Sequence, residues 1–426
     1  MHCELINRML HTPIRFDWLL RWNKAALSTA LFHLAVALAF FGSLHPWFLW
    51  VPDAGVYVLI MLMMGASYYI DCTMQTQPKR NVAWLRLALP FALASVSMLY
   101  SGGGTFLGLL ALLIRIAYVS LMFYHDGEAM RRAMDFVTRC MAVLLLVSMS
   151  GFALYLLGYP LPSSAVSYAD KYDFYNYYLF LILDGDLWLF FPRFQSVFLE
   201  PSHLAVACVL LLMLQVGRWR RWYNVVLITA TLISFSLEGY VLLVCLFFLG
   251  RWILRRHVVR GIALSIFVVG SVAVGSFYYH DGENILNRMI MQRLEVRDGN
   301  LVGNNRTTDS FDAEYESFLS TSDIWMGREA LKDFGNAGYK VFIYTNGVVG
   351  LTLFLLFYAV VLYHPSHLRP VVTAATIAAI HFIVSSFLMK ESCILPFYCM
   401  AWHYVLPDNQ DATGVECQSV ENKVQS

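Results

Sequence analysis

The stretch Arg193-Phe-Gln-Ser-Val-Phe-Leu-Glu-Pro-Ser-His203 ends a long polar segment and opens a hydrophobic one. It places an arginine and a carboxylate, Arg193 and Glu200, at the predicted boundary of a membrane. Charged side chains are costly in such a place, so their presence there suggests a function. Two explanations stay open: an anchor at the membrane interface, and a binding site for an anionic substrate that is linked to a lipid.

The composition around this stretch is that of a membrane protein. Of the 426 residues, 58% are hydrophobic and 14% are charged, whereas about a quarter of the residues of an average soluble chain are charged. The formal net charge of +1 gives no reason to expect nucleic acid as a partner. The eight cysteines are scattered, with only a loose pair at Cys393 and Cys399, so neither a disulfide framework nor a metal site is predicted.

The sequence predicts an all-α, polytopic membrane protein of about 11–12 helices, because a membrane span needs about 20 mostly apolar residues. Ser234, Ser236, Glu238 and Gly239 interrupt one apolar stretch, which favours a tight hairpin there over one long helix. The last segment is short enough to be re-entrant. The predicted segments are 25–43, 51–71, 84–100, 105–124, 139–158, 202–217, 223–237, 239–250, 261–278, 345–363, 370–388 and 394–406.

Lysine and arginine collect on alternate turns between these segments, which predicts that both termini are cytoplasmic. No short apolar core with a small-residue cleavage site precedes the first segment, so we expect an uncleaved cytoplasmic start. The same orientation leaves two long loops on the outer side, 159–201 and 279–344, and a cytoplasmic tail at 407–426. The basic groups lie at 8–24, 79–80, 131–139, 218–221 and 251–260.

The two outer loops hold most of the polar chemistry. Loop 159–201 mixes tyrosines and a tryptophan with acids, which suits sugar binding because aromatic rings pack on the apolar faces of pyranoses. An aromatic belt at the membrane interface is the alternative. Loop 279–344 carries arginines among interleaved acids. An arginine binds phosphate bidentately and stays charged, but these arginines also suit a small solvated subdomain in which they pair with its own acids.

Four short stretches, taken in order, resemble the bacterial O-antigen and exopolysaccharide polymerases and their ligase relatives. They are Arg193 to Pro201, Ser234 to Gly239, Asn305-Arg306, and Tyr344 to Gly350 with its Gly-x-x-Gly. The hydropathy layout is similar over most of the chain. The ligase branch usually places a histidine upstream of the Gly-x-x-Gly, where this chain has Asn336, and that departure favours the polymerase branch.

This resemblance implies a glycosyltransferase in the bacterial inner membrane, with the two long loops in the periplasm. Such an enzyme transfers a growing glycan from one undecaprenyl-diphosphate carrier to a second lipid-linked repeat unit, without a nucleotide sugar, a cofactor or a metal. Its product would be O-antigen, capsule or exopolysaccharide. Besides the bilayer, a chain-length regulator and a flippase would be its partners.

The resemblance also implies roles for individual residues. Arg193, Arg306 and Arg328 would bind the diphosphate, and Glu200 would act as general base or orient the acceptor hydroxyl. Glu200 before Pro201 also fits the ordinary start of a helix, and a neighbouring histidine would share or replace its role. The residues expected to contact the substrate are Arg328, Lys340, Tyr344, His203 and Arg288.

Three polar residues, Arg115, Glu238 and His381, lie in apolar segments and each requires a partner or a polar cavity. Arg115 lines a path for the diphosphate or belongs to an internal pair, and Glu238 is a second candidate carboxylate. The competing class of protein is a flippase or exporter. Transporters commonly show repeats and binding groups near the midplane, whereas here the polar residues gather in outer loops, which favours an enzyme. A non-catalytic subunit is a third possibility.

Overall fold

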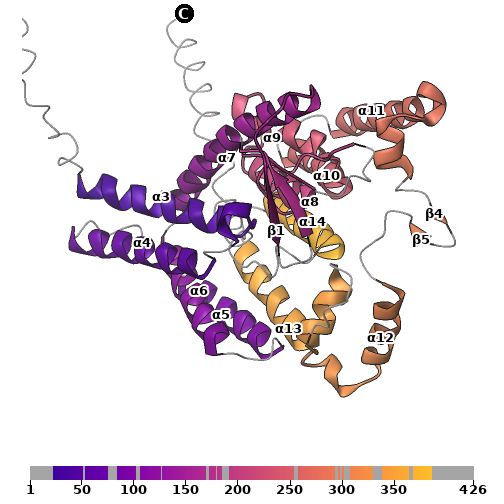
Figure 1. Ribbon diagram of the computed structural model, residues 1–426. Helices are drawn as coiled ribbons and strands as arrows, with labels where there is room; N and C mark the ends of the chain where they lie inside the picture. Colours follow the sequence, from indigo (N-terminus) through magenta and orange to yellow (C-terminus); the bar gives the residue numbers. More distant parts are fainter. Residues whose placement is uncertain are drawn as a thin grey trace, which may run out of the picture.

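The structure of the protein is a computed structural model, and within its described residues the chain is mostly helical (Figure 1). The predicted segment 394–406, the tail 407–426, Arg306 and Asn336 lie outside the described residues. The described ranges are 23–50, 53–74, 84–101, 106–125, 127–168, 172–178, 180–184, 191–253, 258–292, 296–297, 300–301, 308–329, 338–363 and 368–385.

Each predicted apolar segment that falls in these ranges is a helix. By length and composition, four helices of the described chain can cross a membrane: Lys24–Gly42, Gly55–Thr73, Gly127–Leu156 and Tyr339–Leu362. The helices that match predicted segments are α3 (Lys24–Gly42), α4 (Asp53–Thr73), α5 (Trp84–Ser101), α6 (Phe106–Tyr124), α7 (Gly127–Leu156), α8 (Pro201–Met213), α9 (Trp222–Ile233), α10 (Leu237–Ile253), α11 (Val258–Tyr278), α13 (Tyr339–Leu362) and α14 (Leu368–Val384).

Helix α7 begins well before the predicted residue 139, so that boundary was wrong. Its first turns are amphipathic. Arg131 pairs with Glu128 at 2.7 Å and with Asp135 at 3.4 Å, one turn before and one turn after it, while Met130 and Met134 are buried. Pairs at these spacings stabilise a helix, but their charges hide it from a search for continuous apolar segments.

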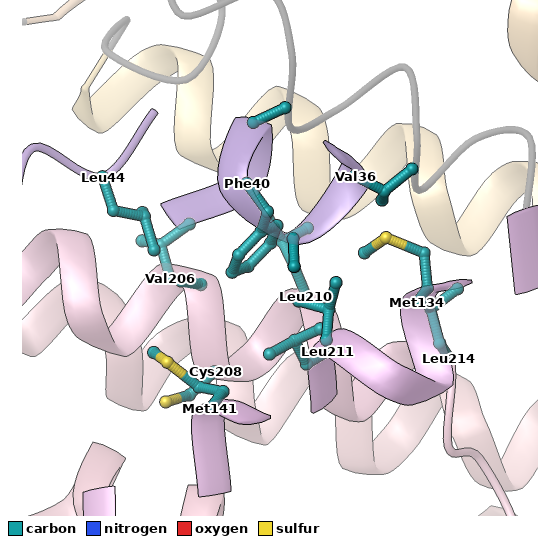
Figure 2. Close-up of a cluster of buried hydrophobic side chains, with 14 of the residues drawn as sticks. Val36, Phe40, Leu44, Met134, Met141, Val206, Cys208, Leu210, Leu211 and Leu214 are labelled. Carbon is teal, nitrogen blue, oxygen red and sulfur yellow. The ribbon is translucent and has the colours of Figure 1, made fainter. Parts of the chain in front are cut away.

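Helix α8 lies at the centre of the core, and every side chain from Leu204 to Met213 is buried. Figure 2 shows it between α3 and α7. A helix that is apolar all round is expected to be enclosed in this way. The labelled side chains of this cluster are Val36, Phe40 and Leu44 of α3, Met134 and Met141 of α7, and Val206, Cys208, Leu210, Leu211 and Leu214 from α8 and its C-cap.

The predicted hairpin between α9 and α10 is confirmed. Ser236 precedes α10 and its hydroxyl accepts a hydrogen bond from the Gly239 backbone N–H at 3.2 Å, a helix N-cap. Ser234 accepts from the Ser236 N–H at 3.3 Å. Gly239 faces α8 so closely that a Cβ on it would lie 2.5 Å from the Ala205 Cβ. The predicted Ser-x-Ser stretch is therefore a turn that docks α10 onto α8.

The two long segments contain short strands, which the all-α prediction did not include. Strands β1 (Ser164–Tyr168), β2 (Tyr172–Asn176) and β3 (Ile182–Asp184) form an antiparallel sheet in that order. Alternation and aromatic residues favour strands here. The sheet covers the segment after α3, because the Trp50 ring lies 4.9 Å from that of Tyr168. A second pair, β4 (Val296–Arg297) and β5 (Asn300–Leu301), is also antiparallel.

Backbone hydrogen bonds join α13 to the segment that precedes it. It contains α12 (Asp309–Leu319) and the 3₁₀ turn η5 (Ser322–Ile324). Helix α13 breaks at Gly347, where φ is +64°. There the Arg328 N–H donates to the Tyr344 carbonyl at 2.7 Å, and the Val349 N–H donates to the Trp325 carbonyl at 3.0 Å. Gly347, the first glycine of the Gly-x-x-Gly, thus lies where the preceding segment is hydrogen-bonded to α13. We call this region the Gly347 joint.

Replacing Gly347 with alanine should destabilise the fold. A Cβ there would lie 2.4 Å from the Trp325 carbonyl oxygen, and the combination of φ +64° with ψ −178° is essentially restricted to glycine, costing a residue with a Cβ about 1–3 kcal/mol. The purified Gly347→Ala protein should therefore unfold in detergent at a lower temperature than the wild type. Gly65→Ala is the control, since nothing lies within 4 Å of its position in α4. Equal unfolding temperatures for the two variants would contradict this account of the joint.

Candidate functional site

The strip 193–200 is a buried segment anchored to several elements, although the sequence alone marks it only as the end of a loop. The Ile182 N–H donates to the Ser196 carbonyl at 2.7 Å, and the Trp47 N–H donates to the Val197 carbonyl at 3.0 Å. Pro46 and Phe198 form an antiparallel bridge. The Phe194 N–H reaches the Ile233 carbonyl at 3.4 Å. The strip is thereby fixed to β3, to the segment after α3 and to the end of α9.

Three residues around this strip have a backbone conformation that is unfavourable for their type. They are His45 (φ +48°), Ser196 (φ +56°) and Phe235 (φ +49°). Such residues persist only where the surrounding structure holds them, and they gather at functional sites. The Phe235 ring packs against Phe191 with centroids 5.7 Å apart.

Glu200 and His203 stand at the start of α8. Glu200 is the residue before the first helical position, which Pro201 occupies. The Ser202 hydroxyl donates to Glu200 Oε2 at 2.9 Å, and His203 Nε2 lies 3.9 Å from the same oxygen. The Glu200 side chain is 41% exposed and that of His203 only 10%. A partly exposed carboxylate is thus backed by a nearly buried imidazole.

Glu238 and His381 form a buried pair between α10 and α14. His381 Nδ1 and Glu238 Oε1 are 2.5 Å apart, and the side chains are 4% and 1% exposed. An ionisable group so deeply buried requires a partner, and each of these residues provides it for the other. The sequence marked both as isolated polar groups but gave no sign that residues so far apart in the chain meet.

The two pairs form one cluster. His203 lies close enough to Glu238, His381 and His45 to interact electrostatically with all three, as well as with Glu200. We call these five residues the Glu/His cluster. Among the described residues, no three His, Cys, Asp or Glu side chains are placed to hold a metal ion. The Glu200 carboxylate is the partly exposed member of this cluster.

Arg193 lies near the α9–α10 hairpin. It is half-buried and interacts electrostatically with Tyr240, which follows Glu238 in the first turns of α10. The Tyr240 hydroxyl donates to the Leu232 carbonyl at 2.5 Å, so this tyrosine is held against the α9–α10 hairpin. A guanidinium binds anions such as phosphate bidentately.

Arg328, Lys340 and Tyr344 come together in a second cluster, around α12 and the start of α13. Arg328 donates to Glu314 at 2.8 Å and to Asp323 at 2.7 Å. The hydrogen bond to Asp323 raises the pKa of Arg328 further above its ordinary value. Tyr344 donates to Glu314 at 3.3 Å, and Lys340 donates to Asp312 at 2.7 Å. These basic groups therefore pair with the acids of their own segment, as the solvated-subdomain interpretation expects.

The start of α13 makes an apolar contact with the end of α14. The rings of Phe342 and Phe382 have centroids 5.3 Å apart, and Phe382 directly follows His381. A Cβ on Gly338 would lie 3.4 Å from the Ile383 carbonyl oxygen. The start of α13 thus packs against the end of α14 that carries His381.

The remaining candidates lie elsewhere. Arg288, just after α11, is 3.5 Å from Glu283. Arg306 falls outside the described residues, so its position relative to the Glu/His cluster is untested. Arg115 of α6 donates to the Tyr57 hydroxyl of α4 at 3.3 Å and lies over its ring. That contact fits the internal pair proposed for Arg115.

Comparisons with protein-family models, with curated proteins and with solved structures found no match to this chain.

The close approach of Gly239 to Ala205 is predicted to set the spacing of α8 and α10. Gly239→Ala should lower the unfolding temperature in detergent, since overpacking a core typically costs about 1–3 kcal/mol. Adding Ala205→Gly should recover part of that loss, because it removes the colliding methyl. Ala205→Gly alone should be destabilising, by about 1 kcal/mol, as glycine is in a helix interior. If the two losses simply add in the double variant, the two residues do not define this spacing.

Proposed function

We propose that this protein polymerises undecaprenyl-diphosphate-linked oligosaccharide repeat units at the outer face of the bacterial inner membrane. In this proposal it is a polytopic glycosyltransferase with both termini cytoplasmic. Segments 159–201 and 279–344 lie in the periplasm, and the repeat units belong to O-antigen, capsule or exopolysaccharide. A chain-length regulator and a flippase are its proposed partners.

One observation carries the proposal: Glu200 and His203 stand together where a deeply buried helix begins, directly after the anchored strip that carries Arg193. Glu200 is open to a substrate, His203 lies behind it, and Arg193 stands on the anchored strip that leads to them. The chain around them is apolar. This combination suits a reaction between two amphipathic substrates whose sugars are polar and whose carriers are lipids.

The transfer reaction requires groups of these kinds. The acceptor oxygen bonds to the anomeric carbon of the donor, the bond from that carbon to the diphosphate breaks, and the bonding pair leaves with the diphosphate. Arg193 would offset the negative charge that develops there, which is most effective in a site of low dielectric constant. Glu200 would take the proton of the acceptor hydroxyl as general base.

The arrangement of polar groups favours this enzyme over a transporter. The Glu/His cluster is at the ends of α8, α10 and α14 rather than at their middles, whereas transporters place their binding groups near the midplane. The ligase alternative uses the same lipid-diphosphate chemistry, and only the measured product distinguishes it from the polymerase.

Polymer length is the decisive measurement. A null strain is complemented with wild type, Arg193→Ala or Glu200→Gln, and its surface polysaccharide is separated on a gel. Loss of the general base should reduce polymerisation by about 100-fold or more, and loss of the charged donor by about 100-fold. Both variants should leave single repeat units on the final acceptor while reaching wild-type levels in the membrane.

The matched control is Arg220→Ala, which removes an exposed arginine from the turn before α9, away from the cluster. It should restore long chains. If Arg193→Ala and Glu200→Gln restore them as well, the site is wrong. A null strain that accumulates finished polymer without attaching it indicates a ligase, and one that presents no repeat units outside the cytoplasm indicates a flippase or exporter.

A further inference from the structure

The segment 322–328, between α12 and α13, exposes two large apolar side chains beside a helix that can cross a membrane. Trp325 is 60% exposed and Met326 39%, and α13 is long and apolar enough to span a bilayer. Single exposed apolar side chains are ordinary on a protein surface. The backbone of this segment, however, is arranged in a way that indicates what covers these two.

Four consecutive backbone N–H groups of the segment are all hydrogen-bonded within the protein. The donors are Trp325, Met326, Gly327 and Arg328, and the acceptors are the carbonyls of Ser322, Asp323 and Tyr344, at 2.7–3.3 Å. The Trp325 carbonyl in turn accepts from the Val349 N–H at 3.0 Å. Lipid offers no hydrogen bonds, so non-helical backbone that meets a bilayer has to be satisfied internally, whereas a loop in water can bond to solvent.

The Gly347 joint also fixes the direction of the two side chains. A Cβ on Gly347 would lie 2.4 Å from the Trp325 carbonyl oxygen, and one on Gly327 would lie 2.4 Å from the Thr345 carbonyl oxygen. The backbones of the segment and of α13 are therefore in direct contact. No room is left between them for the side chains of Trp325 and Met326, which project outward instead.

The packing of α13 on α5 gives the level of Trp325 along the helices. The two helices run antiparallel, because the Phe357 ring meets that of Phe91 with centroids 5.4 Å apart, while a Cβ on Gly350 would lie 3.6 Å from the Ser97 hydroxyl oxygen. The residue before Gly350 donates to the Trp325 carbonyl. Trp325 thus lies near the level of Ser97.

This level is the end of an exposed apolar row on α5. The row follows one face of the helix and stops one residue before Ser97. Exposed apolar rows of this kind mark contact with a membrane or a partner, and tryptophan is enriched where the hydrocarbon layer gives way to the headgroups. The row consists of Leu85, Leu89, Leu93 and Val96, which are 46–62% exposed.

We propose that Trp325 and Met326 form a phospholipid-contact site that holds the Gly347 joint at the bilayer interface. The Trp325 ring lies among the headgroups and the Met326 side chain reaches the ends of the acyl chains below them. Arg328 and Asp323, which pair at 2.7 Å, stay at the headgroup level. The site requires only that α13 crosses the membrane, so it goes beyond the proposed reaction and does not depend on it.

Photocrosslinking in native membranes tests the site. The photoreactive amino acid p-benzoylphenylalanine replaces Trp325 in the full-length protein, and the irradiated protein is purified and searched by mass spectrometry for a covalent phospholipid adduct. Leu93, in the exposed row of α5, is the positive control. Glu316, an exposed position of α12, is the matched negative control. We expect adducts at Trp325 and Leu93 and none at Glu316.

Three results overturn the inference. The first is a phospholipid adduct at Leu93 without one at Trp325. The second is an equal adduct at Glu316, because contact is then not specific to this segment. The third is an adduct at Trp325 with an isoprenoid diphosphate or with another protein chain in place of a phospholipid, since the surface then has a different occupant.

A second measurement uses an ordinary substitution. In bilayers of brominated phosphatidylcholine, bromine atoms quench the fluorescence of tryptophans that contact lipid. Trp325→Phe should reduce the quenched part of the fluorescence relative to wild type, and because the side chain is exposed, the variant should elute from a sizing column as the same monodisperse peak. An unchanged quenched part in the folded variant contradicts contact between Trp325 and lipid.

Discussion

Complete burial of α8 is the constraint on which the rest of the structure depends. From Leu204 to Met213 no side chain of this helix reaches the surface, so neighbouring helices must enclose it, as α3 and α7 do in Figure 2. Between apolar helices in a membrane, close packing rather than the hydrophobic effect drives association, and small residues permit it. Gly239 against Ala205 is such a contact. Only the ends of α8 are left for polar groups.

That constraint explains why the polar groups of the site depend on so many distant elements. His203 is enclosed because α8 is enclosed. Glu238 and His381 come from α10 and α14, and burying either alone would leave an unpaired ionisable group in an apolar interior, which is strongly unfavourable. The pair therefore couples the docking of the two helices. Helix α13 adds to this, because it packs on the end of α14 through Phe342 and Phe382.

The sequence predicted the helices well because continuous apolar segments are a strong local signal. It missed the first turns of α7, where Arg131 and its acidic partners give an amphipathic pattern, and it missed β1–β3, whose strands are short. For the candidate site, it predicted roles for Arg193, Glu200 and His203 from their place at an apolar boundary, and those roles stay predictions. It marked Glu238 and His381 individually, but their pairing depends on tertiary packing and has no local signal. The contribution of His45, which arises from the turn after α3, was not predicted.

The length of α8 affects how far water can compete with the acceptor sugar for the donor. At about 1.5 Å per residue, its 13 residues extend about 20 Å, whereas the hydrocarbon layer of a bilayer is about 30 Å thick. In the proposed setting, a helix this short cannot bring its first turn level with the lipid headgroups unless its other end is recessed by the whole difference. A recessed first turn would draw the carrier's diphosphate inward and leave little bulk solvent around the reacting carbon. Hydrolysis of the donor would then be suppressed relative to its transfer to a sugar hydroxyl, so chain growth would not be lost to water.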